Sequence, residues 1–371
     1  MKLLTVIGAR PQIIKAAAIS RAIKAYFSET ISNIILHTGQ HYDENMSQQF
    51  FSELQIPQPL INLGIGSGPQ GEQTAKMLTG IEQALTKQHF DGVIIYGDTN
   101  STLAGALAAS KIQTPVFHIE AGLRSYNMTM PEEQNRIISD QLSNICFAPT
   151  QTAVDNLRRE GFFGSPTRFH HNRERRIILS GDVMYDNTLF YAQLASKQSR
   201  LLLNLQLKKD HYILATVHRN YNTDNLQRLT SIFQALTAIA NETTVVIPLH
   251  PRTKKLLATV DLPHLDRLLF IPPVSYLEML VLEQNAQVVM TDSGGVQKEA
   301  FFFERPCVIM RPETEWTEII DHGAGILADA DTDHIVEAYR QFSHCTVHFP
   351  PLFGDGHAAE KIVNEIRSYL S

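Results

Sequence analysis

Short apolar runs alternate with helix-like segments along the first half of the chain. Each run has the length and the glycine or polar boundary of a buried strand, and the segment after it has apolar residues at helical spacing. The expected strands cover residues 3–8, 33–37, 92–97, 115–120 and 147–149, and helices are expected to begin near Pro11, Ser101 and Pro131. Strands that alternate with helices predict βαβ units and therefore a parallel sheet.

The same alternation restarts in the second half. Strands are expected over residues 212–218, 244–250, 267–271, 288–291 and 307–310, with an amphipathic helix over 225–240. The pattern predicts an α/β protein with two Rossmann-like, doubly wound parallel-sheet domains that face a cleft. We expect the first domain over residues 1–175, the second over 176–355 and a helix over 356–371. The aperiodic, Arg- and His-rich stretch near 165–185 is expected to be an exposed linker.

Charge and cysteine content narrow the class of protein. The 371 residues include 32 Lys and Arg against 38 Asp and Glu, a net charge of −6. We therefore expect no binding to nucleic acid or to an anionic membrane, and a negatively charged ligand would need a local positive site. No apolar run approaches the roughly 18 residues that span a bilayer. Three cysteines without a CxxC spacing argue against a disulfide framework and favour a reducing cytoplasm.

Charged residues follow the strands of the first half, at the sheet edge where parallel α/β proteins bind ligands. Residues 8–11 (GARP) follow the first strand, and Lys15 lies one turn into the next helix. Their backbone N–H groups and two cations could meet an anion, although a simple strand–helix turn is the alternative. Asp98 and Glu120 end two later strands. Asp98 is either a cleft carboxylate or the N-cap of the following helix.

A third carboxylate comes from the helix expected to begin at Pro131. Glu132 and Arg136 lie four residues apart and therefore share a helix face. A favourable acidic helix start and one surface ion pair would explain them without a catalytic role. If Asp98, Glu120 and Glu132 instead share one cleft, their pKa values split and supply an acid and a base near neutral pH.

The second half carries a strong pattern for phosphate binding. Residues 293–295 (SGG) form a small turn where a strand enters a helix, so that backbone N–H groups can approach a diphosphate. Glu299, one to two turns further on, could accept hydrogen bonds from ribose hydroxyls. A serine cap with glycines required for packing is the alternative. His218 and His250 each end a strand, and no HExxH or paired CxxC spacing predicts a metal.

With these residues in view, the chain resembles the non-hydrolysing UDP-N-acetylglucosamine 2-epimerase family. The matching segments are GARPQIIK, HTGQHYD, YGDTNSTLAG, HIEAGLR, MPEEQNR, GDVMYD, TDSGGVQKEA and FGDGHA, which together run along essentially the whole chain. The resemblance implies a GT-B fold with UDP mainly on the second domain, a homodimer, and a C-terminal helix that packs on the first domain. It also implies that no redox cofactor is needed.

The implied reaction is an elimination followed by a re-addition. A base removes the C2 proton while UDP leaves C1, and UDP then returns to the 2-acetamidoglucal as a proton arrives on the other face of C2. This chemistry requires two acid/base groups and cations at the diphosphate. The residues carried over from the family are Asp98, Glu120 and Glu132 as acid/base candidates with His218 in the catalytic set, Arg10, Lys15 and Arg136 as supports of the diphosphate and sugar, Ser293, Gly294 and Gly295 for phosphate, and Glu299 for ribose.

Two departures from the family pattern concern the substrate. Bacterial members that act on UDP-N-acetylglucosamine often carry QHxxM and a later Arg that hold an activating copy of that sugar nucleotide. Here Tyr42 and Asp43 follow Gln40 and His41, and residues 64–71 contain no Arg. Trp316 stands where those members have the Arg of TERPE.

These features resemble the branch that epimerises UDP-2,3-diacetamido-2,3-dideoxyglucuronate for surface polysaccharides. We therefore expect that substrate, with UDP-N-acetylglucosamine as the alternative. A GT-B glycosyltransferase or a non-catalytic UDP-sugar sensor ranks lower, because neither accounts for the carboxylate trio. The extra C6 carboxylate requires a spare cation, for which Arg124, Arg219 and Arg252 are candidates.

Overall fold

The computed structural model describes residues 1–40, 51, 54, 56–162, 175–249, 251–257, 260 and 262–371, without the side chains of residues 198, 251 and 252. It divides into two compact units, which we describe separately. The N-terminal unit contains Met1–Asn187 and Pro351–Ser371, and the C-terminal unit contains Thr188–Pro350. The division therefore lies later than the expected boundary at residue 175, because residues 176–187 belong to the N-terminal unit.

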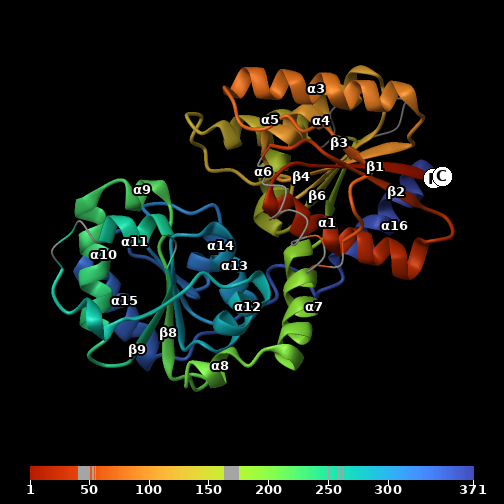
Figure 1. The fold of residues 1–371 in the computed structure, drawn as a ribbon. Helices are drawn as coiled ribbons and strands as arrows, with labels where there is room; N and C mark the ends of the chain where they lie inside the picture. Colours follow the sequence, from red (N-terminus) through yellow and green to blue (C-terminus); the bar gives the residue numbers. More distant parts are fainter. Residues whose placement is uncertain are drawn as a thin grey trace. The chain divides into compact units, whose positions relative to one another are not determined.

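The N-terminal unit is built on a seven-stranded parallel sheet in the order β3-β2-β1-β4-β5-β6-β7 (Figure 1). Its strands are β1 (Lys2–Ile7), β2 (Ser32–His37), β3 (Ile61–Asn62), β4 (Gly92–Tyr96), β5 (Val116–Ile119), β6 (Ile145–Ala148) and β7 (Arg176–Leu179). Its helices are α1 (Arg10–Ala22), the π-helical turn η1 (Ile23–Phe27), α3 (Gln70–Lys87), α4 (Asn100–Lys111), α5 (Pro131–Leu142), α6 (Gln151–Arg159) and α16 (Ala358–Leu370).

Strand β1 shows that this sheet is buried on both faces, because its successive residues from Leu3 to Ile7 point to alternate faces and are all buried. Leu4 and Val6 pack in one apolar cluster with Met77 of α3 and Ala104 of α4. Fully buried parallel strands read as continuous apolar runs, which explains why β1 and β4 are evident in the sequence. Helix α16 packs against α1, and its first N–H groups donate to Asp186. Burial raises the pKa of that carboxyl to about 6.

The C-terminal unit is built on a six-stranded parallel sheet in the order β10-β9-β8-β11-β12-β13. Its strands are β8 (Tyr212–Thr216), β9 (Thr244–Pro248), β10 (Leu269–Ile271), β11 (Val288–Thr291), β12 (Cys307–Ile309) and β13 (Gly325–Leu327). Its helices are α8 (Leu201–Asn204), α9 (Asn220–Thr223), α10 (Leu226–Ile239), α11 (Pro251–Leu257), the 3-10 turn η3 (Leu265–Arg267), α12 (Tyr276–Asn285), α13 (Gly294–Phe302), α14 (Thr317–Asp321) and α15 (Thr332–His344), and α7 (Val183–Gln198) enters this unit from the other.

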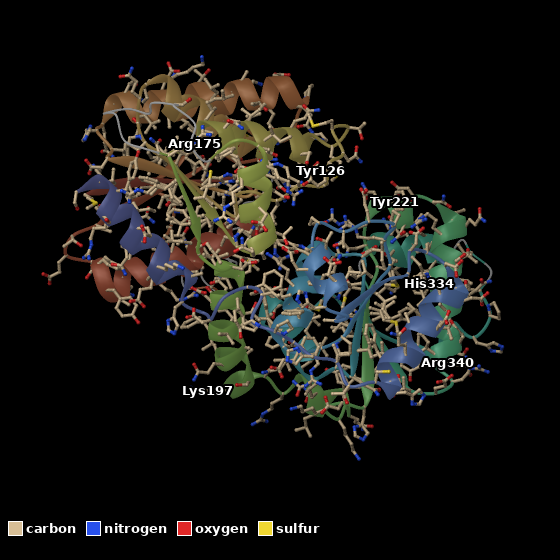
Figure 2. The ribbon with its side chains drawn as sticks, turned by 180° about the vertical axis from the view of Figure 1, so that it is seen from behind. Tyr126, Arg175, Lys197, Tyr221, His334 and Arg340 are labelled. Atoms are coloured by element: carbon tan, nitrogen blue, oxygen red, sulfur yellow. The ribbon has the colours of Figure 1, made fainter. Side chains whose placement is uncertain are left out.

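Both faces of this second sheet are covered as well. Alternate residues of β8, Ile213 and Ala215, pack with α10 and α15, whereas Tyr212 and Leu214 pack with α12 and α13. Figure 2 shows Tyr221 of α9 and His334 and Arg340 of α15 on the outer parts of this unit. Among the described helices, none has the length and apolar character that crossing a bilayer requires.

Three strands are absent from the sequence-based expectation, namely β3, β7 and β13. Each is two to four residues long, and none is a fully buried apolar run. Strand β7 corrects the expectation of a linker over 165–185, because it pairs with β6 from Ile145↔Arg176 to Ala148↔Leu179. Residues 165–174 of that stretch lie outside the described part of the chain.

Candidate functional site

Each unit has one place where the order of its strands reverses, between β1 and β4 and between β8 and β11. The crevice outside the carboxyl ends of such strands is where open α/β sheets bind ligands. In the N-terminal unit, residues 8–10 and Asp98 follow the two central strands. In the C-terminal unit, His218 and residues 292–295 occupy the equivalent positions. The segments singled out from the sequence therefore lie at both reversal points.

Asp98 lies at the end of β4 after Gly97, whose φ of +59° turns the backbone away from the strand. The N-cap of α4 is Thr99, and its side chain accepts a hydrogen bond from the N–H of Thr102. The interpretation of Asp98 as a helix cap is therefore wrong. Its Oδ2 atom instead lies 2.6 Å from Nη2 of Arg136.

Glu120 follows β5 and forms a buried ion pair with Lys15 of α1. A Cβ atom on Gly97 would lie 3.3 Å from both the Glu120 carboxylate and the Lys15 ammonium, so glycine leaves room for this pair. Burial raises the pKa of Asp98; Arg136 and Lys15 oppose this shift, and Glu120 adds to it. Asp98 and Glu120 are thus electrostatically coupled, which is the condition for dividing acid and base roles.

The expected pairing of Glu132 with Arg136 is not what the structure shows. Nη1 of Arg136 lies 2.8 Å from Glu133, three residues away. The Glu133 carboxylate is buried and also accepts hydrogen bonds from the N–H groups of Ser125 and Tyr126. Glu132 is exposed in the first turn of α5. The sequence shows two adjacent glutamates here, and only their contacts distinguish the structural one from the exposed one.

The turn after β1 differs from its expected role. Two of the N–H groups of the segment that we expected to meet an anion, those of Gly8 and Ala9, donate to Oε1 of Gln12 at 2.8 and 3.1 Å. Gln12 is buried and also donates to the carbonyl of Tyr96 at 2.9 Å. Arg10 is exposed at the first position of α1. An anion at this turn would therefore meet the Arg10 guanidinium rather than these two N–H groups.

Ser293 occupies the N-cap position of α13, but its side chain makes no capping hydrogen bond. The first N–H groups of a helix lack partners within the helix. A Cβ atom on Gly295 would meet nothing within 4 Å, whereas one on Gly294 would lie 2.6 Å from Oε1 of Glu315. A side chain at position 294 would thus displace the end of the Glu315 side chain, whereas Gly295 leaves the helix start open to a ligand.

His218 is fixed at its backbone by Asp292, a fully buried carboxylate at the end of β11. Asp292 accepts hydrogen bonds from the N–H groups of His218 and Arg219 and from Nδ2 of Asn222. The His218 side chain is 46% exposed, with Nδ1 3.4 Å from Asp292. Asp292 was not among the predicted site residues, although its place directly before the Ser-Gly-Gly turn could have indicated a role there.

Glu299 is buried on α13 near two other ionisable groups, Glu283 and Tyr276. Burial, then the Glu299 charge, raises the pKa of Glu283 well above its usual range. Burial and both carboxylates raise the pKa of Tyr276 as well. Both shifts favour the neutral forms of Glu283 and Tyr276, and the Glu299 carboxylate contributes to both shifts. Glu299 is thus the carboxylate of this group that can accept hydrogen bonds from hydroxyls.

The structure also shows the contacts of Trp316 and of two of the three arginines that we considered as partners of a C6 carboxylate. Trp316 is buried, with Nζ of Lys298 4.1 Å from its ring centroid. Arg124 is not available for a substrate carboxylate, which corrects that expectation, because Asp140 and Glu160 hold its buried guanidinium. Arg219 is exposed. His41, Tyr42, Asp43, His250 and the side chain of Arg252 lie outside the described residues.

Comparison with known proteins identifies the family. The family model described as UDP-N-acetylglucosamine 2-epimerase matches residues 24–367. The chain belongs to this family. A UDP-2,3-diacetamido-2,3-dideoxy-D-glucuronate 2-epimerase of Pseudomonas aeruginosa is 50% identical over 364 residues, which cover 98% of each chain. A UDP-N-acetylglucosamine 2-epimerase of Methanocaldococcus jannaschii is 41% identical over 371 residues, again covering 98% of each chain.

Solved structures agree with this assignment. The crystal structure of the Methanocaldococcus jannaschii UDP-GlcNAc 2-epimerase in complex with UDP-GlcNAc and UDP matches with a TM-score of 0.85 and 40% identity. The match covers 99% of this chain and 100% of that one. The expected GT-B fold and the expected class of non-hydrolysing UDP-sugar 2-epimerase are confirmed. Within the described residues, no group of three His, Cys, Asp or Glu side chains could hold a metal ion.

Proposed function

We propose that this 2-epimerase inverts C2 of a UDP-2-acetamido sugar, with Asp98 and Glu120 as the acid/base pair and UDP-2,3-diacetamido-2,3-dideoxyglucuronate as its substrate. The observation that carries the proposal is the coupled pair of carboxyl groups at the end of β4 and β5, each beside a cation. Such a pair supplies the two proton transfers that elimination and re-addition of UDP require.

The environments of the two carboxyl groups suggest how the roles divide. Glu120 contacts the Lys15 ammonium, which favours its ionised form, and it would accept the C2 proton as the C1–O bond to UDP breaks. Asp98, whose pKa burial raises, would deliver a proton to the other face of C2 as UDP returns to C1. The roles exchange in the reverse direction. Glu132, exposed at the start of α5, remains the third candidate.

The C-terminal unit supplies the groups for UDP. The N–H groups of Gly294 and Gly295 and the Ser293 hydroxyl would bind the diphosphate, because the helix N-terminus is positive. Glu299 would accept hydrogen bonds from the ribose hydroxyls. His218 and the three cations Arg10, Lys15 and Arg136 would stabilise the charge on the departing diphosphate and the sugar.

The choice of substrate rests on three observations. The diacetamido-glucuronate relative is 50% identical, against 41% for the UDP-N-acetylglucosamine relative. Trp316, at the position where the family resemblance implies an arginine, is buried under Lys298. The amides of Gln40 and Gln73 are bonded within the unit, to Ser101 and to Asn100 and Gly66 respectively. These bonds do not favour a second, activating sugar nucleotide at that edge.

Turnover in heavy water tests the reaction. During epimerisation, NMR should show deuterium at C2 of both the product and the recovered substrate. Full retention of protium at C2 during turnover would overturn the elimination mechanism. Transfer of the sugar to an acceptor, or binding without any turnover, would favour the glycosyltransferase or the sensor instead.

Steady-state kinetics on the two UDP-sugars test the substrate. We expect a much larger kcat/KM for UDP-2,3-diacetamido-2,3-dideoxyglucuronate, and no activation on addition of UDP-N-acetylglucosamine. Arg219→Ala should lower kcat/KM for the glucuronate more than for UDP-N-acetylglucosamine if this exposed cation meets the C6 carboxylate. A larger kcat/KM for UDP-N-acetylglucosamine would refute the substrate and leave the epimerase assignment intact.

We also propose that the enzyme works as a homodimer in the cytoplasm and supplies a sugar nucleotide for surface polysaccharide. The support is the family resemblance together with three cysteines that are all unpaired thiols. Light scattering coupled to size exclusion measures the oligomeric state, and a monomer at working concentration would contradict it.

A further inference from the structure

The fully buried side chain of His118 on β5 lies between two hydrogen-bond acceptors. Its Nε2 atom is 2.7 Å from the carbonyl oxygen of Gly97, and its Nδ1 atom is 2.7 Å from Oδ1 of Asp140 on α5. Gly97 directly precedes Asp98, and His118 itself lies two residues before Glu120. The imidazole therefore touches the backbone on which both proposed acid/base residues are mounted.

The partners determine the charge of this imidazole. A carbonyl oxygen can only accept, so Nε2 must carry a proton. Oδ2 of Asp140 lies against the Arg124 guanidinium, which is always charged, and accepts a hydrogen bond from the N–H of Gly122, so these contacts hold the carboxyl of Asp140 in its ionised form. An ionised carboxylate also only accepts, so Nδ1 must carry a proton too. The two contacts together require a doubly protonated, positively charged ring.

Asp140 links the His118 ring to the backbone that follows Glu120. Its Oδ2 atom accepts a hydrogen bond from the N–H of Gly122 at 3.2 Å and lies 2.7 Å from Nη1 of Arg124. Glu120 has a φ of +67°, a left-handed conformation that costs free energy in a residue with a Cβ atom. The bonds on residues 118 and 122 hold the backbone on both sides of this strained position.

We propose that His118 is a positioning residue for epimerisation, which as an imidazolium holds the Gly97 carbonyl and, through Asp140, the Gly122 N–H, and so fixes Asp98 relative to Glu120. This inference rests on the proposed function of those two carboxyl groups. His118 exchanges no proton with the substrate. Its contribution is to keep two proton-transfer groups at one spacing, on which the rate of each transfer depends.

The charge state can be measured without any substrate. The full chain is labelled with ¹⁵N-histidine, and the ring ¹H–¹⁵N correlations are recorded at pH 7, with the His118 signals assigned by their loss in His118→Gln. Both ring nitrogens of His118 should carry a proton. A ring with one unprotonated nitrogen would overturn the proposal, whether or not the enzyme proves to be an epimerase.

Two substitutions separate the two hydrogen bonds. A glutamine amide reaches the position of Nε2 and can still donate to Gly97, whereas an asparagine amide reaches only the position of Nδ1 and can donate to Asp140. We expect kcat to fall ~100-fold in His118→Asn, which is the lower end of what general acid–base catalysis contributes. In His118→Gln we expect kcat to fall less than ~10-fold. UDP affinity should stay unchanged in both, because His118 is not one of the groups proposed to contact UDP.

The comparison distinguishes positioning from a purely structural role. Each variant loses one hydrogen bond, so a structural role would lower the two melting temperatures similarly and leave kcat per folded enzyme the same in both. Equal kcat values for the two variants would overturn the proposal. His89→Gln is the control, because it changes a histidine that also lies beside a carboxylate, 3.3 Å from Asp91, but whose side chain is 86% exposed. If the wild type shows no C2 exchange, the proposed function fails, and the NMR result still decides the charge of His118.

Discussion

After β4 and β5 of the N-terminal unit, Asp98 and Glu120 each lie against a cation from a helix. After β11 of the C-terminal unit, the corresponding turn instead consists of Ser293, Gly294 and Gly295, with helix N–H groups left uncapped. One edge holds charged groups in fixed places, and the other provides space and backbone donors. The contrast predicts that substitutions at the first edge change turnover or stability, and that those at the second change nucleotide affinity.

The two units also fix the loop after their first strand in different ways. In the N-terminal unit the clamp is the neutral amide of Gln12, which belongs to the helix that follows the loop. In the C-terminal unit it is the carboxylate of Asp292, which comes from a neighbouring strand. Three hydrogen-bond donors around Asp292, the N–H groups of His218 and Arg219 and the Asn222 amide, offset the cost of burying that charge.

Lys15→Met should have the largest effect on stability, because it leaves Glu120 buried without its cation. Loss of one partner of a buried pair costs ~3–5 kcal/mol of the free energy of unfolding. Urea unfolding measures it, and adding Glu120→Gln should restore most of the loss. Lys76→Met is the matched control, since its pair with Glu72 is exposed and contributes about 0.5 kcal/mol. Equal losses in the two variants would contradict a buried charge pair.

Asp98→Asn should lower turnover ~100-fold or more, because the amide cannot transfer a proton. Isothermal titration should show UDP affinity changed little, since no proposed UDP contact is altered. Asp155→Asn, an exposed carboxylate on α6, serves as the control for removing a negative charge from the same unit. Near-normal turnover of Asp98→Asn would remove Asp98 from the acid/base pair.

Gly295→Ala tests the other edge. The new methyl group meets no described atom within 4 Å, so the fold should tolerate it and the helix gains up to ~1 kcal/mol. UDP affinity should nevertheless fall about tenfold, which corresponds to about 1.4 kcal/mol, because the methyl group obstructs the approach of a phosphate. Gly294→Ala should instead displace the Glu315 carboxylate from its place beside Arg311, and we expect the free energy of unfolding to fall by about 1 kcal/mol or less. Unchanged UDP affinity in Gly295→Ala would place the diphosphate elsewhere.

Glu283→Gln should have the smallest effect. Because burial and Glu299 raise the pKa of Glu283 and so favour its protonated form, the amide replaces a neutral group of the same shape, and we expect the free energy of unfolding to change by less than about 1 kcal/mol. Asp140→Asn is the contrast, because it leaves the buried Arg124 without one of its two carboxylates. A large loss in Glu283→Gln would show that this carboxyl is ionised.

The long strands could be predicted because each lies wholly within an apolar run. β3, β7 and β13 could not, because their pairing with a neighbour, rather than their composition, makes them strands. Asp98, Glu120 and residues 293–295 followed from one rule, that ligands bind at the carboxyl ends of parallel strands. That rule says where a residue lies along its strand and nothing about which partner it meets.

The errors and omissions all concern such partners. Arg124 read as a spare cation, but Asp140 and Glu160 lie 16 and 36 residues away in the sequence and pair with it only in the fold. Glu132 and Glu133 cannot be distinguished in the sequence, and only the fold shows that Arg136 pairs with Glu133. His118 belongs to a matching segment, yet its role depends on Gly97 and Asp140, which the sequence does not place beside it.

The return of residues 351–371 to the N-terminal unit has a consequence for synthesis on the ribosome. Residues 188–350 are complete, and can fold, while the first unit still lacks α16. Until that helix emerges, the surface of α1 that it covers stays exposed, and Asn144 lacks the hydroxyl of Tyr369 to which it donates at 3.1 Å. The unit made first is therefore finished last, and a nascent chain halted before residue 351 presents an apolar surface that chaperones bind.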